Sequence, residues 1–261
     1  DPDKPAIVER IAASMYRSSE AQIAAGNNVE AVSRLLQIRI IAPGSEIAIA
    51  AQYDAANQLI ELKDFTQAES VLLDFGKRYP EHELSKTIPP KLAFIYQESE
   101  QWGKAAGQLS LLASSGDPQA RRTSLYLSAE LYEKSGNTNK ALDQYRKYAN
   151  TYPQPFDLAI ESRFKMVEIY KANGDNGKRN YWLKDLIEQD RKAGANRTGR
   201  SKYLAAMGTS KFANDEYERF NKIKLTLPVK KSMRKKKSAM DQTLKSYRKV
   251  LDYGVAEFST D

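Results

Sequence analysis

Four alanines recur along the chain at a nearly constant interval. They are Ala31, Ala68, Ala105 and Ala141, spaced 37, 37 and 36 residues apart. A proline-containing turn follows each alanine about twelve residues later, and a break in the apolar pattern precedes it by a few residues. A fixed period of roughly 20 to 50 residues indicates a repeat architecture. We therefore predict that each unit is a helix, a tight turn, a second helix and a stop.

The alanine has a physical purpose in such a unit. Two antiparallel helices that cross closely need a small side chain at the crossing, because a larger one would push the backbones apart. Apolar residues surround each alanine at helical spacing, as Leu59, Leu72 and Phe75 do around Ala68. Stacked units then share one continuous core, so the chain grows by adding repeats.

The unit over residues 122–152 carries the most informative pattern. It has Ala129, Tyr132, Gly136 and Ala141, and Pro153 follows it. This pattern resembles the tetratricopeptide repeat. The resemblance implies an all-α fold, a right-handed superhelical solenoid of antiparallel helix pairs, with about five repeats over residues 1–192.

Two of the expected repeats are degenerate. The first has Gln22 where the family has a tyrosine, and the fifth, from Ile160 to about Gln189, has Arg179 in place of the alanine and lacks the closing proline. Terminal repeats are commonly atypical. We expect the solenoid to bend or end at the fifth unit.

A narrower resemblance concerns the Gram-negative envelope. The period of 36 to 37 residues and turns such as the one ending at Pro80 look like envelope repeat proteins, among them the barrel-assembly lipoprotein and the Tol-Pal coordinator. The segments 220–236 and 253–257 are similar to repeat proteins that accompany TonB-type energy systems or motility complexes. The resemblance implies a periplasmic address, which the absence of cysteine suits, with the cytoplasm as the alternative. The carboxyl-terminal end, residues 255–261, looks cut in mid-pattern, so we expect a fragment of a longer protein.

Residues 193–261 form a second region with a different character. Two long helices are predicted, over residues 201–225 and 229–253, with Pro228 in the first turn of the second. An apolar stripe recurs along the second helix at intervals of three, four or seven, and we expect it to pack on another surface: Val229, Met233, Met240, Leu244, Tyr247 and Leu251.

The positive charge is concentrated in this predicted basic hairpin. Residues 222–249 contain eleven lysines and arginines and one acid, a local charge of +10, which leaves the rest of the chain at −2 out of a total of +8. The candidate basic patch comprises Lys230, Lys231, Arg234, Lys235, Lys236 and Lys237. Three interpretations are open: a solvated helix face, a contact with an anionic protein or membrane surface, and a nucleic-acid contact. The last is the weakest, because no nucleic-acid-binding motif accompanies the lysines.

A second candidate surface follows the first helix of each repeat, whose fifth position faces the concave side in the family. That position and the one a turn later define an aromatic ladder as the candidate partner groove: Tyr16, Tyr53, Asn57, Phe94, Tyr126, Glu130, Phe164 and Glu168. Aromatic rings and carboxylates suit an extended or helical peptide with basic side chains. The same aromatic residues could instead pack against the neighbouring repeat.

The inventory of reactive residues argues against an enzyme. His82 is the only histidine, cysteine is absent, and neither a glycine-rich phosphate loop nor a metal-ligand pair at helical spacing is found. No apolar run reaches the roughly 18 residues of a membrane-spanning helix. We expect no catalytic residues, no metal, no cofactor and no small-molecule substrate.

Two hypotheses of function follow from the sequence. The first is a scaffold that binds a peptide or protein domain in its concave groove within a periplasmic assembly. The second is a tether to an anionic surface, membrane or nucleic acid, through the lysine-rich hairpin. Binding to phosphate weakens steeply with salt, whereas an apolar groove hardly responds, so ionic strength separates the two.

Overall fold

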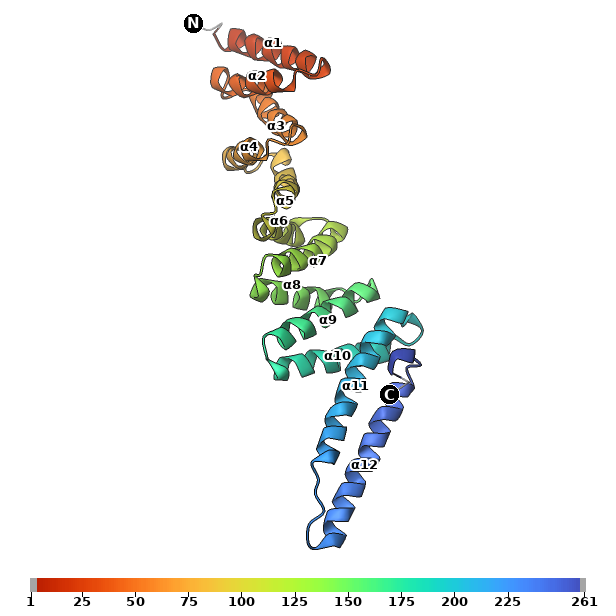
Figure 1. Ribbon diagram of the computed structural model, residues 1–261. Coiled ribbons are helices and arrows are strands. Elements are labelled where there is room, and N and C mark those ends of the chain that lie inside the picture. Colours follow the sequence, from red (N-terminus) through yellow and green to blue (C-terminus); the bar gives the residue numbers. More distant parts are fainter. Residues whose placement is uncertain (1–3, 259–261) are drawn as a thin grey trace. The chain divides into compact units, whose positions relative to one another are not determined.

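A computed structural model describes residues 4–258 (Figure 1). Across these residues the chain forms twelve α-helices and three short 3₁₀ helices, without a strand. The prediction of an all-α solenoid built from antiparallel helix pairs is confirmed. The expectation about the carboxyl-terminal end falls partly on residues 259–261, which lie outside the described part, as do residues 1–3.

The chain divides into two compact units, with the division between Asn137 and Thr138. The predicted division near residue 192 separates repeats from the basic region by sequence character, and it stays a prediction. The first unit contains these helices: α1 (Lys4–Ala24), α2 (Asn28–Ile41), α3 (Glu46–Glu61), α4 (Phe65–Arg78), η1 (Glu83–Thr87), α5 (Ile88–Glu98), α6 (Trp102–Ser115) and α7 (Pro118–Lys134).

The second unit continues the alternation and adds the hairpin. Its helices are α8 (Thr138–Thr151), α9 (Phe156–Ala172), α10 (Asn176–Ala193), η2 (Gly194–Asn196), α11 (Gly199–Asn221), α12 (Val229–Leu251) and η3 (Ala256–Phe258). The helices α11 and α12 run antiparallel and side by side, and they extend beyond α10 (Figure 1). Both are longer than the helices of the repeats.

All four periodic alanines are fully buried. Ala31, Ala68, Ala105 and Ala141 lie in the first turns of α2, α4, α6 and α8, each with no exposed surface. Within the first unit these second helices pack on the first helices before them, as α4 packs on α3. A close helix crossing requires a small, fully buried residue, and all four alanines meet this requirement.

A left-handed residue ends the first helix of every repeat. These residues are Gly26, Lys63, Glu100, Gly136 and Gly174, so the conformation recurs with the period of the repeat, and Gly194 and Gly254 also have positive φ after the last repeat. Glycine adopts this conformation freely, whereas a side chain makes it unfavourable by about 1–2 kcal/mol. The turn is therefore imposed by the repeat even where Lys63 and Glu100 oppose it.

The degenerate fifth repeat still forms a helix pair. The helices α9 and α10 pack against each other, although Arg179 replaces the small residue at the start of α10. Its side chain is only half-buried, and Trp182, Leu183 and Leu186 supply the buried face instead. The substitution changes the start of the repeat and does not abolish it.

The hairpin differs from its prediction in two respects. Helix α11 ends at Asn221 rather than near residue 225, and Pro228 precedes α12 as its N-cap rather than lying in its first turn. Within the described residues the apolar stripe of α12 is uncovered for most of its length, since Met233, Met240, Leu244 and Leu251 are exposed, so what it packs on stays a prediction. The buried residues of α12 are Thr243 and Val250, on the neighbouring face.

Enlarging a crossing residue should destabilise the first unit. We expect Ala68→Leu to lower the free energy of unfolding by about 1–3 kcal/mol, because the added atoms overpack a site with no free surface. Leu73→Ala is the matched control on the same helix, since its side chain is half-exposed and should cost far less. Chemical denaturation followed by circular dichroism measures both, and equal midpoints would contradict the role of the alanine.

Relieving the left-handed turn should have the opposite effect. Glu100→Gly removes roughly 1–2 kcal/mol of backbone strain and adds roughly 0.5–1 kcal/mol of unfolded-chain entropy, so we expect a net gain of about 0.5 kcal/mol. Gly136→Ala, at the equivalent position, should lose stability instead. Denaturation midpoints that move the same way in both variants would refute this account.

Candidate functional site

In the first unit, the phenol groups of the aromatic ladder bond to other repeats. The Tyr16 hydroxyl donates to Asp54 Oδ2 at 2.5 Å, and this bond together with burial raises the pKa of Tyr16. The Tyr53 hydroxyl lies 2.6 Å from Thr87 Oγ1, just before α5. The polar ends of both rings are therefore used to join successive repeats.

The other ladder residues of the first unit differ in exposure. Phe94 is the most exposed, at 45%, and its ring packs edge-on against Phe65 with centroids 6.3 Å apart. Tyr126 is buried, at 9%, whereas Asn57 and Glu130 are half-buried. The ladder residues of these helices therefore differ in how much of each side chain a partner could contact.

The ladder residues of the second unit lie on α9. Phe164 packs beneath the guanidinium of Arg200, 5.3 Å from the ring centroid, and Arg200 pairs with Glu161 at 3.1 Å. Glu168 pairs with Lys171 at 3.9 Å. A peptide groove along the whole ladder stays a prediction.

The largest described cavity of the first unit lies on other helices. It is a groove of about 900 Å³ with α2 and α4 as walls and α3 as its floor, hereafter the second-helix groove. Val29 and Ile40 stand on its rim, 72% and 75% exposed, and Leu36 and Val71 line it. Exposed apolar side chains beside a groove of this size are typical of a binding surface.

The sequence analysis did not single out this groove. Its signal is the apolar residues of α2 that do not belong to the buried stripe of Ala31, Leu35 and Ile38, above all Val29 and Ile40. The pattern of one helix shows that these apolar residues lie outside its buried face. It does not show that α4 faces them across a gap.

A polar network fixes the helices around the groove. Gln52, 1% exposed at its floor, donates from Nε2 to Asp74 Oδ2 at 2.9 Å, and Arg39 of α2 reaches the same carboxylate at 3.3 Å. Burial raises the pKa of Asp74, but hydrogen bonds from Arg78 and Gln52 outweigh it and leave the pKa below its usual value. The carboxylate thus links α2, α3 and α4 while ionised.

The residues of the predicted basic patch all lie in the first half of α12. Five of the six are exposed: Lys230, Lys231, Arg234, Lys235 and Lys237. Lys236 is half-buried, with its ammonium 5.1 Å from the ring centroid of Phe220 on α11. The structure thus brings five charged groups to the surface and turns one toward the partner helix.

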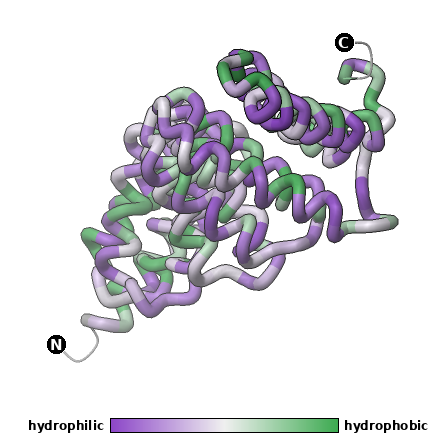
Figure 2. The backbone as a smooth tube through the Cα atoms, turned by 90° about the horizontal axis from the view of Figure 1, so that it is seen from below, coloured by the Kyte–Doolittle hydropathy of each residue, from purple (hydrophilic) through white to green (hydrophobic). Residues whose placement is uncertain are grey.

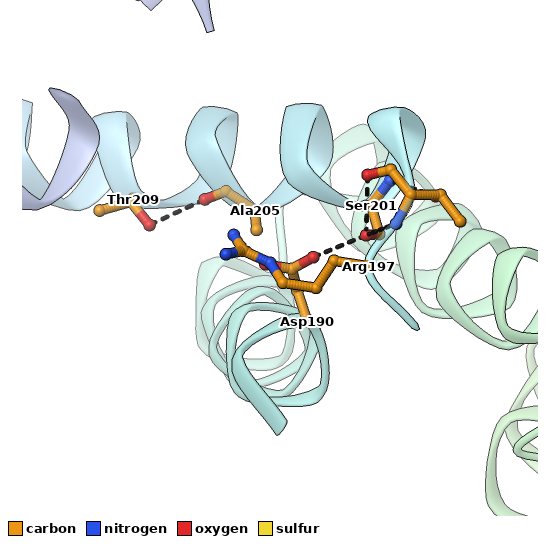
Figure 3. Close-up of polar contacts among 6 residues, drawn as sticks. Asp190, Arg197, Ser201, Ala205 and Thr209 are labelled. Carbon is orange, nitrogen blue, oxygen red and sulfur yellow. Dashed lines mark hydrogen bonds and ion pairs between the residues drawn. The ribbon is translucent and has the colours of Figure 1, made fainter. Parts of the chain in front are cut away.

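A buried ion pair attaches the hairpin to the repeat before it. Figure 3 shows the Asp190 carboxylate of α10 beside Arg197 and Ser201. Asp190 is fully buried and lies 2.7 Å from Arg197 Nη2, and it accepts a hydrogen bond of 2.6 Å from Ser201 Oγ. Ser201 and Thr198 also form the capping box that starts α11. The same carboxylate therefore holds both the connection and the helix start.

Close packing continues the junction along α11. Gly208 faces α10, and a Cβ at this position would lie 2.9 Å from Leu183 Cδ1. A pocket of about 540 Å³ opens nearby among α10, α11 and α12, with Phe212 and Tyr253 in its lining. Two of its four basic residues, Arg191 and Arg197, are already paired with Glu188 and Asp190, and the other two are Lys184 and Lys249.

Neither a metal site nor a membrane-spanning helix is found among the described residues. His82 caps η1, and its Nδ1 accepts from the Leu84 amide at 3.2 Å. Within residues 4–258 no three histidine, aspartate or glutamate side chains gather as a metal site. In the same part of the chain, every helix is too short or too polar to span a bilayer.

Removing the buried carboxylate should loosen the hairpin. We expect Asp190→Ala to cost about 3 kcal/mol, since it leaves Arg197 and Ser201 without their acceptor. Hydrogen exchange should accelerate in α11 and α12 more than in α9. Asp215→Ala is the control, because its ion pair with Lys211 is partly exposed and contributes at most about 1 kcal/mol. Equal exchange rates in wild type and Asp190→Ala would contradict this assignment.

Comparison with known proteins agrees with the geometry of the repeats. Residues 50–82 and 123–155 match the tetratricopeptide repeat family. A tetratricopeptide repeat protein from Parabacteroides merdae is 15% identical, covers 94% of this chain and 94% of its own, and has a TM-score of 0.43. MamA from Desulfovibrio magneticus RS-1, from residue 41 to its end, is 17% identical over 69% of this chain and 96% of its own, with a TM-score of 0.41. No curated protein matches the chain.

Proposed function

Because the chain carries tetratricopeptide repeats, we propose that it is a non-enzymatic scaffold that binds a segment of another protein. Tetratricopeptide repeats mediate protein–protein interaction. The observation that carries the proposal is the second-helix groove, with Val29 and Ile40 exposed on its rim. Apolar side chains at the rim of a groove gain free energy when a partner removes them from water.

The shape and polarity of the groove favour a short segment over a small molecule. The groove is open, and its lining runs along two helices and combines apolar residues with Ser33, Gln37, Gln67 and Ser70. Such polar groups can bond to the backbone of a bound segment while Leu36 and Val71 contact its side chains. Asp74 pairs with both Arg39 at 3.3 Å and Arg78 at 2.8 Å, and Asp64 also lines the groove, so the charges around it balance and contribute little.

The aromatic ladder is the alternative surface for the same function. Phe94 supports it through its exposure, whereas Tyr16 and Tyr53 already hold bonds to other repeats. We further propose that the protein works in a periplasmic assembly of the TonB-associated kind, on the strength of the sequence resemblance alone. Osmotic-shock fractionation of the native cells tests this address, and recovery in the cytoplasmic fraction would refute it.

The groove proposal predicts where a peptide ligand binds. Peptides selected from a random phage-displayed library on the immobilised chain should lose roughly tenfold or more in affinity with Val29→Asp and Ile40→Asp, because the changes charge the apolar rim. Fluorescence anisotropy measures the Kd. Raising the salt from 50 to 500 mM should change it little, since apolar contacts are not screened.

Two further variants make this test decisive. Leu73→Asp with Leu111→Asp changes two exposed apolar residues outside the groove, 49% and 55% exposed, and should leave the Kd unchanged. Tyr53→Ala with Phe94→Ala probes the ladder. Loss of affinity only in the ladder variant would move the binding site to the ladder. Failure to select any peptide, or equal binding by all variants, would overturn the proposal.

A further inference from the structure

The face of α12 that packs on α11 is small and polar. Ser232, Ala239, Thr243 and Val250 recur along it at intervals of seven and four, and all are buried or half-buried. The Tyr247 hydroxyl donates to Asn214 Oδ1 at 2.6 Å on the edge of the same contact. The hairpin therefore closes without using the larger apolar residues of α12.

Those larger residues form a separate face, hereafter the outer stripe. It comprises Val229, Met233, Met240, Leu244 and Leu251, which are 40–55% exposed. At about 100° per residue the five positions fall within an arc of roughly 60°, and α12 is about 34 Å long. Leu227, 87% exposed in the connection, extends the row at its start. Along the hairpin, green apolar positions interrupt the purple in Figure 2.

Three basic residues stand directly beside the outer stripe. Lys230, Lys237 and Arg248 lie about 50–70° around the helix from its centre. Among residues 4–258, none of the eleven basic side chains between Lys222 and Lys249 takes part in an ion pair. The stripe thus offers apolar contact in a field of uncompensated positive charge. An occupant must be both apolar and anionic.

Charge and shape separate the classes of occupant. A second copy would bring +10 against +10, so self-association through this face is opposed. Nucleic acid would use the lysines but not a row of Met, Leu and Val side chains, since bases stack on aromatic rings. A protein partner would fit pockets, but the stripe lines neither the second-helix groove nor the pocket near Tyr253.

Lipid meets both requirements at once. We propose that α12 binds the surface of anionic phospholipid bilayers, with the outer stripe at the boundary between headgroups and acyl chains and the lysines around it contacting lipid phosphates. Nine of the eleven basic residues are lysines, whose long flexible stems can lie along apolar surface while the ammonium stays in water. A fluid surface needs no pocket, and a helix with an apolar face and a lysine-rich face binds in this manner.

Vesicle binding tests the proposal on the whole chain. Flotation with vesicles of phosphatidylcholine alone and of phosphatidylcholine with 40 mol% phosphatidylglycerol should recover protein only with the second, and less at 300 mM than at 50 mM salt. Reversing the four exposed basic residues nearest the stripe, Lys230, Arg234, Lys237 and Arg248, to Glu should lower the partition coefficient by roughly a hundredfold. Changing Met233, Met240 and Leu244 to Ser should lower it by roughly tenfold.

Matched variants separate docking from general effects of charge and hydrophobicity. The charge control reverses four exposed lysines elsewhere, Lys77, Lys86, Lys147 and Lys202, and the apolar control changes Leu73, Leu111 and Leu127 to Ser. Both should bind vesicles like wild type. Circular dichroism establishes that each variant keeps its helices.

The absence of cysteine permits a direct readout of depth. A polarity-sensitive fluorophore on Met240→Cys should shift to the blue on anionic vesicles, and the same label on Gln242→Cys, on the exposed polar face, should not. Four results would overturn the proposal: no flotation of wild type, full binding by the stripe variant, equal shifts at both labels, or a label at Met240 already shielded without vesicles. The last result would mean that protein covers the stripe.

Single-stranded DNA tests the competing assignment. If the chain binds DNA more strongly than vesicles, and the stripe changes leave DNA binding unaffected, the basic patch is assigned to nucleic acid and the proposal is overturned.

Discussion

The close crossing at a buried alanine is the contact on which the repeats depend. At Ala31, Ala68, Ala105 and Ala141 the position admits only a methyl group, since each alanine is fully buried. The crossing fixes the distance between helices, and the left-handed residue a few positions earlier fixes the direction in which the second helix starts. Because both constraints are met within one repeat, residues on the remaining faces of each helix are not needed for its packing. Those faces carry the exposed residues from which binding surfaces are made.

Much of the fold could be predicted from sequence because its signals are local. The alanine period, the turn prolines and the breaks at Gly26, Gly136 and Gly174 each act within one repeat. Even Arg179, which removes the small residue, leaves α10 in place because Trp182 and Leu186 bury another part of its surface. Several turns of a helix each contribute buried residues, so the helix forms even when one of these residues is replaced.

The orientation of α12 could not be predicted in the same way. Two rows with heptad spacing compete on this helix, one of Ser232, Ala239, Thr243 and Val250 and one of larger apolar residues. Hydrophobicity favours the second row, but the structure packs the first against α11. Small side chains permit a closer approach, and Tyr247 adds a hydrogen bond to Asn214 there. The choice depends on what α11 presents, which no pattern within α12 contains.

The second-helix groove is a tertiary feature for a related reason. It exists because α2 and α4 each pack on α3 and leave a gap between them, and its walls are held by the Asp74 carboxylate across three helices. The aromatic ladder has a related limit. Its positions can be read from the repeat pattern, but the hydrogen bonds of Tyr16 and Tyr53 to the next repeat cannot. A repeat pattern identifies which side chains leave the core, and the neighbouring repeat decides whether they remain available.

Because the positive charge is concentrated in the hairpin, binding at α12 and binding in the second-helix groove should respond differently to salt. The hairpin holds +10 on residues 222–249, whereas the rest of the chain sums to −2. Exposed charges are screened beyond about 10 Å at 0.1 M salt, so attraction to α12 depends on ionic strength and on the charge of the surface it meets. Around the groove the charges of Arg39 and Arg78 are balanced by those of Asp74 and Asp64, so binding there depends instead on apolar area. Contacts at the hairpin can therefore strengthen or weaken with salt while the affinity of the groove stays nearly constant.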